Sequence, residues 1–215
     1  MTFKAVIFDL DGTLVNTLSD IAYAVNRTRL YYSLKEKTEE EIKVMIGNGA
    51  RVLIKRAFSE ENVTEDFIDE ALAVYKNILD NNLTVRTKVY SGICETLKKL
   101  KDENVKIAIL SNKDNSHVKG IVKELFPPVF DAVWGYSPTY PHKPDPASLH
   151  AIIKELGLSL NEVLYVGDMS VDVVTARNAG LTSVGVLWGY GGEEAFSENK
   201  PDFLIQTPEE LLNII

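Results

Sequence analysis

Short apolar runs alternate with segments of helical periodicity over most of the chain, and this alternation constrains the fold more than any other feature. The first run, residues 5–8, is bounded by polar residues, as is typical of a strand buried on both faces. Later runs occupy residues 105–110, 130–134, 163–166, 183–187 and 203–205. Helix-period segments occupy residues 93–102, 116–126, 146–156, 171–179 and 208–215. The alternation predicts an α/β fold, a doubly wound parallel sheet with helices on both faces.

Residues 15–84 interrupt this alternation. They contain stretches with apolar residues at helical spacing, residues 18–30, 39–46 and 64–79, and no run that predicts a strand. We therefore expect a small helical domain, residues 15–84, inserted directly after the first strand. The predicted α/β core domain comprises residues 1–14 and 85–215.

The charge balance excludes some classes of partner. The chain has 31 Asp and Glu against 23 Lys and Arg, a net charge of −8, so it lacks the basic surplus that nucleic acids and anionic membranes attract. No apolar run is long enough to span a bilayer and no signal peptide is evident, so we expect a cytoplasmic protein. The single cysteine, Cys94, cannot form an intramolecular disulfide, and we expect it to be buried.

Polar residues follow the first predicted strand directly. Asp9 and Asp11 stand at its carboxyl end, where open parallel sheets bind their ligands. Two carboxylates so close together repel each other unless a cation or a functional role compensates. Gly12 lets the chain turn and lets backbone amides approach an anion, and the Thr13 hydroxyl can donate to one. The acidic pair alone fits a structural role equally well, but its surroundings favour a site for an anion and a metal.

Three further segments place polar side chains at one edge of the predicted sheet. Ser111 and Asn112 follow the second core strand, and Lys143 lies in a loop held by prolines. Asp168 follows the strand at 163–166, and Asp172 comes one helical turn later on the same side. Each segment alone also fits a turn, a cap or a solvated charge. Together they favour a hard divalent cation, Mg²⁺, with oxygen ligands, and no Cys or His cluster has the spacing of a zinc site.

In this order, the four segments resemble the motifs of the haloacid dehalogenase superfamily, and the resemblance covers the chain from end to end. It implies a Rossmann-like core and a mobile helical cap. It further implies that Asp9 is the nucleophile, Asp11 the general acid and base, and Lys143 the residue that orients the nucleophile and offsets charge. The implied metal ligands are the Asp9 carboxylate, the Asp11 backbone carbonyl, Asp168 and Asp172. The expected phosphate-binding residues are Gly12, Thr13, Ser111 and Asn112.

The implied reaction is Mg²⁺-dependent hydrolysis of a small phosphorylated metabolite through an aspartyl-phosphate. Residues 46–51 form a glycine-flanked turn before a helix, and Arg51 could bind an anionic leaving group, although an ordinary helix connection has the same composition. With residues 186–191, this turn resembles the phosphoglycolate phosphatases, which makes 2-phosphoglycolate a candidate substrate.

Several alternatives share part of this pattern. A phosphosugar mutase of the same superfamily would pass the phosphoryl group to a second hydroxyl, and a pyrophosphatase would share the cap, but Thr13 resembles the phosphatase branch. A dehalogenase lacks the counterpart of Asp11, and a receiver-like signalling module carries its phosphoacceptor after a later strand. We expect a monomer or a homodimer. The spacing of the histidines suggests no catalysis, so we expect solvent or capping roles for His117, His142 and His150, although the neighbouring Lys143 could bring His142 near the site.

Overall fold

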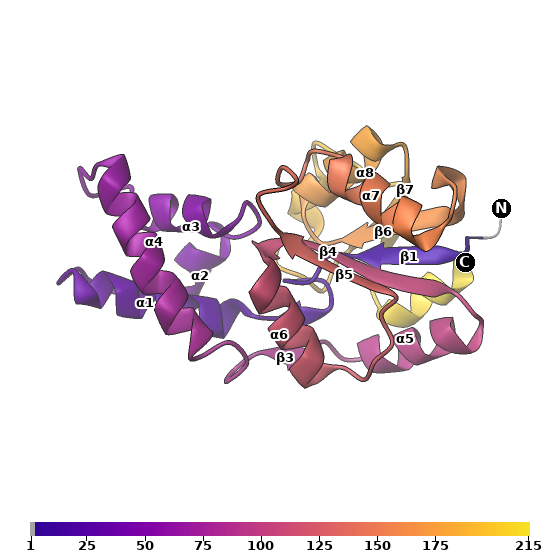
Figure 1. Cartoon of the computed structure of the whole chain (residues 1–215), viewed down its shortest axis with the longest axis horizontal. Helices are drawn as coiled ribbons and strands as arrows, with labels where there is room; N and C mark the ends of the chain where they lie inside the picture. Colours follow the sequence, from indigo (N-terminus) through magenta and orange to yellow (C-terminus); the bar gives the residue numbers. More distant parts are fainter. Residues whose placement is uncertain (1–2) are drawn as a thin grey trace.

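Six parallel strands form one sheet in the order β5-β4-β1-β6-β7-β8, which lies in the right-hand body of Figure 1. The computed structural model describes residues 3–215. The strands are β1 (Ala5–Phe8), β4 (Lys106–Asp114), β5 (Ala132–Tyr136), β6 (Val163–Gly167), β7 (Thr182–Val186) and β8 (Phe203–Ile205). The central strands are apolar throughout because both faces of the sheet are covered, which confirms the predicted α/β fold.

Successive residues of β1 point into two different hydrophobic cores. Val6 and Phe8 pack with the helices on one face, and Ala5 and Ile7 pack with those on the other. The elements on the first face are α5 (Ile93–Asp102), α6 (Asn115–Leu125) and the 3-10 helix η3 (Pro208–Asn213), and those on the second are α7 (Ala147–Leu156) and α8 (Ser170–Ala179). Two short 3-10 helices, η1 (Leu160–Glu162) and η2 (Glu193–Phe196), lie in loops.

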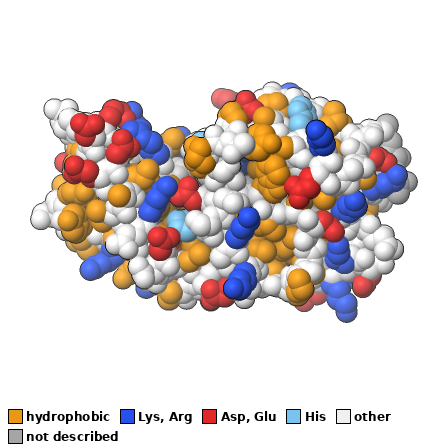
Figure 2. All heavy atoms as spheres, viewed as in Figure 1, with side chains coloured by type: hydrophobic (Ala, Val, Ile, Leu, Met, Phe, Trp, Pro, Cys, Tyr) orange, Lys and Arg blue, Asp and Glu red, His pale blue; other side chains and the backbone are white. Residues whose placement is uncertain are grey.

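Four of the five α-helices between β1 and β4 form a separate body beside the sheet (Figure 1). They are α1 (Leu18–Tyr31), α2 (Glu39–Lys43), α3 (Ala50–Ala57) and α4 (Glu65–Asp80), and we call them the helical insert. Their apolar faces pack on one another in a hydrophobic cluster of their own, to which Tyr190 from the sheet body also contributes. On the face drawn in Figure 2, acidic and basic side chains are interspersed over both bodies.

Three local features differ from the sequence prediction. A short antiparallel ladder, β2 (Val15–Asn16) with β3 (Lys88–Val89), lies where the chain enters and leaves the helical insert. Periodicity cannot detect strands of two residues. The C-terminal segment is a 3-10 helix rather than an α-helix. Cys94 is exposed, because it lies on α5 beside exposed Glu95 and not on the buried face of that helix.

Candidate active site

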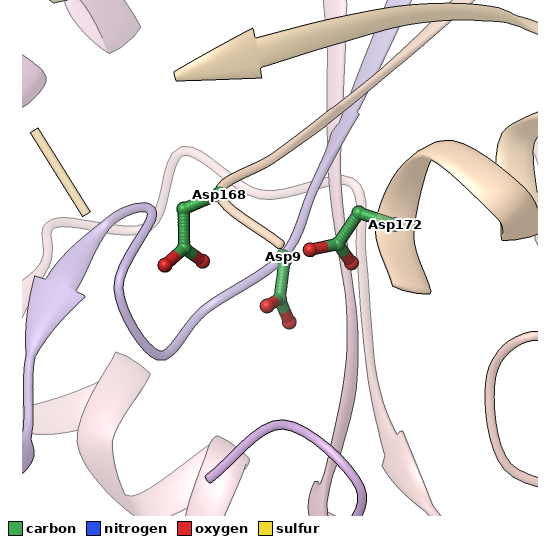
Figure 3. A group of neighbouring side chains, drawn as sticks. All are labelled: Asp9, Asp168 and Asp172. Atoms are coloured by element: carbon green, nitrogen blue, oxygen red, sulfur yellow. The ribbon is translucent and has the colours of Figure 1, made fainter. Parts of the chain in front are cut away.

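Three carboxylates meet at the carboxyl edge of the sheet (Figure 3). Asp9 follows β1, Asp168 follows the neighbouring strand β6, and Asp172 lies in the first turn of α8. One carboxylate oxygen of each lies within 4.8 Å of the others, and all three side chains are buried. Because β1 and β6 run in parallel, their carboxyl ends deliver two of these groups to the same point.

A buried lysine neutralises part of this negative charge. The Lys143 ammonium nitrogen lies 2.9 Å from Asp9 Oδ1 and 2.7 Å from Asp172 Oδ1. Burial alone would lower the pKa of Lys143, but the charges of Asp172 and Asp9 raise it well above its usual value. Lys143 is therefore a fixed cation beside Asp9.

The acidic groups carry more charge than Lys143 alone can compensate. Burial raises the pKa of Asp9 to about 7, while the charge of Lys143 opposes this rise. Burial likewise raises the pKa of Asp168 well above its usual value. Within residues 3–215, the ammonium of Lys143 at 2.9 Å is the polar contact of buried Asp9 Oδ1, which accepts no other hydrogen bond. Three buried carboxylates with a single lysine between them fit a hard divalent cation such as Mg²⁺.

Asp11 lies beside this cluster and turns its carboxylate elsewhere. Thr17 Oγ1 donates to Asp11 Oδ1 at 2.6 Å, and Lys113 Nζ donates to both carboxylate oxygens at 2.9 and 3.1 Å. Thr17 is in turn held by Tyr190, whose hydroxyl accepts a hydrogen bond from the Thr17 amide at 2.8 Å. Asp11 is thus held in one orientation at the lining of the pocket, with its side chain outside the three-carboxylate cluster.

Gly12 and Thr13 lie against Asp168 and do not line the pocket. Gly12 has φ +87°, and a Cβ at this position would overlap the Asp168 carboxylate. Thr13 Oγ1 donates to Asp168 Oδ1 at 3.2 Å, and the Tyr190 amide donates to Asp168 Oδ2 at 2.7 Å. The turn after β1 therefore positions Asp168, a role beyond the phosphate contact expected from the sequence.

Ser111 and Asn112, which we expect to bind phosphate, both line the pocket. Asn112 Oδ1 accepts a hydrogen bond from the Lys143 amide at 2.8 Å, and Asn112 Nδ2 donates to the Gly47 carbonyl at 3.0 Å. The side chain therefore joins the Lys143 loop to the helical insert. Ser111 Oγ accepts a bond from the Lys113 amide at 3.2 Å, and its hydroxyl hydrogen is available to a ligand.

The structure does not bring Arg51 to this site. Its side chain is 45% exposed and pairs with Asp69 and Glu65 of α4, at 3.0 and 2.9 Å. It does not line the pocket. The acidic residues of the neighbouring helix attract the guanidinium away from the sheet edge, which a reading of residues 46–51 alone could not show.

A cavity of about 50 Å³ lies between the sheet edge and the helical insert. The insert contributes Tyr75 and several apolar side chains, and the sheet body contributes Lys113 and His117. His117 is buried and its Nε2 lies 2.6 Å from Asp80 Oδ1, so the expected solvent role is wrong. Lys113 follows Ser111 and Asn112 directly, a position that could have suggested it as a site residue. Tyr75 has the helical spacing of a core residue, so nothing in the sequence indicates that it lines the site.

Comparisons with known proteins identify the family. Residues 6–186 match the model of the haloacid dehalogenase-like hydrolases. The chain belongs to this family. It is 34% identical to the phosphoglycolate phosphatase of Mannheimia succiniciproducens over 220 residues, which cover 99% of this chain and 98% of that protein.

Solved structures of haloacid dehalogenase-like hydrolases agree with this assignment. A predicted phosphoglycolate phosphatase from Haemophilus somnus superposes with a TM-score of 0.93 at 31% identity, covering 100% of this chain and 98% of that one. A haloacid dehalogenase-like hydrolase from Streptococcus pneumoniae superposes with a TM-score of 0.88 at 25% identity, covering 99% and 98%. The chain is a phosphatase of this family, which confirms the family, the fold and the enzyme class predicted from its motifs. No helix among residues 3–215 combines the length and apolar character needed to cross a membrane.

Proposed function

We propose that this phosphatase hydrolyses a small phosphate monoester, 2-phosphoglycolate, in a Mg²⁺-dependent reaction with an aspartyl-phosphate intermediate on Asp9. The observation that carries the proposal is the environment of the Asp9 carboxylate. It lines the pocket, and its Oδ1 lies 2.9 Å from the fixed charge of Lys143. A carboxylate that lines a pocket and is held by an adjacent cation is suited to attack phosphorus.

Two half-reactions follow from this arrangement. In the first, an Asp9 oxygen attacks phosphorus in line with the ester oxygen, and the bond between phosphorus and that oxygen breaks as the new bond forms. Asp11 donates a proton to the departing alkoxide. In the second, Asp11 takes a proton from a water molecule that attacks phosphorus, and the Asp9 carboxylate is released together with inorganic phosphate.

The surrounding groups stabilise the charge that moves in both steps. When bound, Mg²⁺ would offset negative charge on the transferring oxygens. We propose that the Asp9 carboxylate, the Asp11 carbonyl and Asp168 hold it directly. Asp172 Oδ1 already accepts hydrogen bonds from Lys143 and Tyr165, so we propose that Asp172 acts on the metal through water.

Lys143 and the Ser111 hydroxyl complete the proposed phosphoryl site. The Lys143 ammonium supplies a second positive charge that needs no reorganisation during the reaction. We assign the Ser111 hydroxyl, which donates to no acceptor within the described residues, to a phosphoryl oxygen. The Gly12 and Thr13 amides already donate to the carbonyls of Val15 and Leu10, so the phosphate contact expected of them is not assigned.

The proposed domain division and substrate rest on the shape of the molecule. We infer a core domain of residues 1–14 and 85–215 and a cap domain of residues 15–84, because the two bodies have separate hydrophobic clusters and a short ladder at their junction. The cavity lies between the sheet edge and the helical insert, which covers it, and a covered cavity favours a small substrate. Relatives named phosphoglycolate phosphatases support the choice of 2-phosphoglycolate.

The test is phosphate release, with and without Mg²⁺, from 2-phosphoglycolate, pyrophosphate, sugar phosphates and nucleoside monophosphates. We expect Mg²⁺-dependent release with the highest kcat/KM for 2-phosphoglycolate. Asp9→Asn should reduce turnover at least about 10³-fold while circular dichroism shows an intact fold. Broad, weak activity would remove 2-phosphoglycolate as the substrate, and transfer of the phosphoryl group to a sugar hydroxyl would indicate a mutase. Full turnover by Asp9→Asn would disprove the assigned nucleophile.

A further inference from the structure

We propose that Lys113 binds a second anionic group of the substrate, attached close to the leaving oxygen, and thereby selects phosphate esters of small acids. This inference rests on the proposed phosphatase function and deepens it. It replaces the contact expected from Arg51, which pairs with Asp69 and Glu65 of α4 and does not line the pocket.

Few cations can take this role. Among residues 3–215, the basic side chains that line the pocket are Lys113, Lys143 and His117. Lys143 is bound to Asp9 and Asp172 on the side of the attacking carboxylate. His117 Nε2 is already bound to Asp80 of the helical insert. Lys113 is the remaining cation.

The Lys113 ammonium has a donor available for a ligand. Its side chain is 8% exposed, and its two hydrogen bonds, of 2.9 and 3.1 Å, both reach the carboxylate of Asp11. An ammonium group has three N–H donors, so one remains for another acceptor. A donor on a buried cation in a pocket lining favours an anionic ligand, because hydrogen bonds between charged groups are shorter and stronger than neutral ones.

The position of Lys113 relative to Asp11 sets where that anion lies. As general acid, Asp11 must be within hydrogen-bond distance of the leaving oxygen. Lys113 Nζ lies 2.9 Å from the same Asp11 carboxylate, on the leaving-group side of the site. A carboxylate one carbon away from the leaving oxygen, as in 2-phosphoglycolate, would therefore lie next to the Lys113 ammonium.

The helical insert supplies no competing charge to this part of the pocket. Its contribution to the lining is glycine backbone, apolar side chains and the phenol of Tyr75, whose pKa burial raises. The apolar members are Ile21, Ile46, Ala50, Leu53 and Leu79. Because water is largely excluded by such a surface, an ion pair with Lys113 is stronger there than at an exposed site.

The test compares 2-phosphoglycolate with 2-hydroxyethyl phosphate, a neutral-tailed ester of similar size. In wild type we expect kcat/KM to be about 10- to 100-fold higher for 2-phosphoglycolate, the range of a hydrogen bond to a charged group. Lys113→Met should remove most of this preference. A loss by the same factor for both esters would mean that Lys113 only positions Asp11, and would overturn the inference.

A binding measurement tests the inference independently of turnover, and a second variant serves as a control. In the Asp9→Asn background, Lys113→Met should weaken binding of 2-phosphoglycolate by a similar factor in calorimetry. Arg51→Met should leave the preference unchanged, and a preference lost in Arg51→Met instead would overturn the inference. The wild-type comparison needs no variant to fold. Equal kcat/KM for the two esters would overturn only the inference about Lys113. If neither these esters nor any other phosphate ester released phosphate, the proposed function itself would be overturned.

Discussion

Lys76 Nζ on α4 lies 2.8 Å from Asp114 Oδ2 at the end of β4, so an ion pair joins the helical insert to the sheet body beside the pocket. Tyr75 and Leu79 of the same helix line the pocket. We expect Lys76→Met to lower kcat/KM about 2- to 5-fold, because a partly exposed pair contributes about 0.2–1 kcal/mol to holding this wall in place. Steady-state kinetics would measure the loss, and high salt should reduce wild-type activity similarly.

The exchanged pair provides the control for this effect. The double variant with Lys76→Asp and Asp114→Lys should recover most of the lost kcat/KM, whereas Lys98→Met, at an exposed position on α5, should change nothing. If kcat/KM of the double variant stayed as low as that of Lys76→Met, the ion pair would not be the cause of the loss.

Gly12 should tolerate no side chain, because a Cβ would overlap the Asp168 carboxylate. We expect Gly12→Ala to lower kcat at least about 100-fold, since small displacements of site groups have effects of this order. Gly157→Ala is a matched control, because Gly157 also has positive φ, at +69°, but no atom of residues 3–215 lies within 4 Å of the added carbon. It should cost about 1 kcal/mol of unfolding free energy and leave kcat unchanged. Equal losses of kcat in both variants would show that backbone strain alone is responsible.

The sequence predicts the sheet and the sheet-edge residues because both depend on local patterns. Apolar runs of four to five residues followed by Asp9 or Asp168 mark where parallel strands end, and strand direction then brings those side chains together. The observed end of a strand differs from the predicted one where the backbone stays extended beyond the apolar run. Strand β4 is an example, because it continues to Asp114.

The residues that sequence reasoning misplaced depend on contacts between elements distant in the chain. Arg51 turns away from the site because α4 presents Asp69 and Glu65 to it. His117 is buried because α4 ends against α6 with Asp80 at that point. The periodicity of the sequence predicts neither contact, because each depends on how α4 packs against another helix.

Asp20 should be a major stabilising residue of the junction between the two bodies. It is 1% exposed, and its carboxylate accepts hydrogen bonds from the amides of Arg86 and Thr87 and from the Thr87 hydroxyl. Asp20→Ala leaves buried donors without acceptors, so we expect a loss of about 2–4 kcal/mol in unfolding free energy by urea denaturation. Asp66→Ala, at an exposed position on α4, should cost no more than about 0.5 kcal/mol. Similar losses in both variants would contradict this role.

Mg²⁺ binding should strengthen as the pH rises toward and past 7. Burial raises the pKa of Asp9 to about 7 and that of Asp168 well above its usual value, and a metal must displace the protons held there. The sign follows from the raised pKa. Without metal, the stability contributed by protonated Asp9 is present below pH 4 and is lost as the pH rises through about 7. The metal-bound form is not subject to this loss.

The measurement is the increase in Tm caused by a fixed Mg²⁺ concentration at pH 6 and at pH 8. Asp9 with a pKa of about 7 is roughly one-tenth ionised at pH 6 and nine-tenths at pH 8, which corresponds to an affinity about tenfold higher at pH 8. Lys143 stays charged at both values, because its pKa lies well above them. Asp9→Asn should bind Mg²⁺ more weakly and with a smaller pH dependence. An equal increase in Tm at both pH values in wild type would show that Asp9 is already ionised at pH 6.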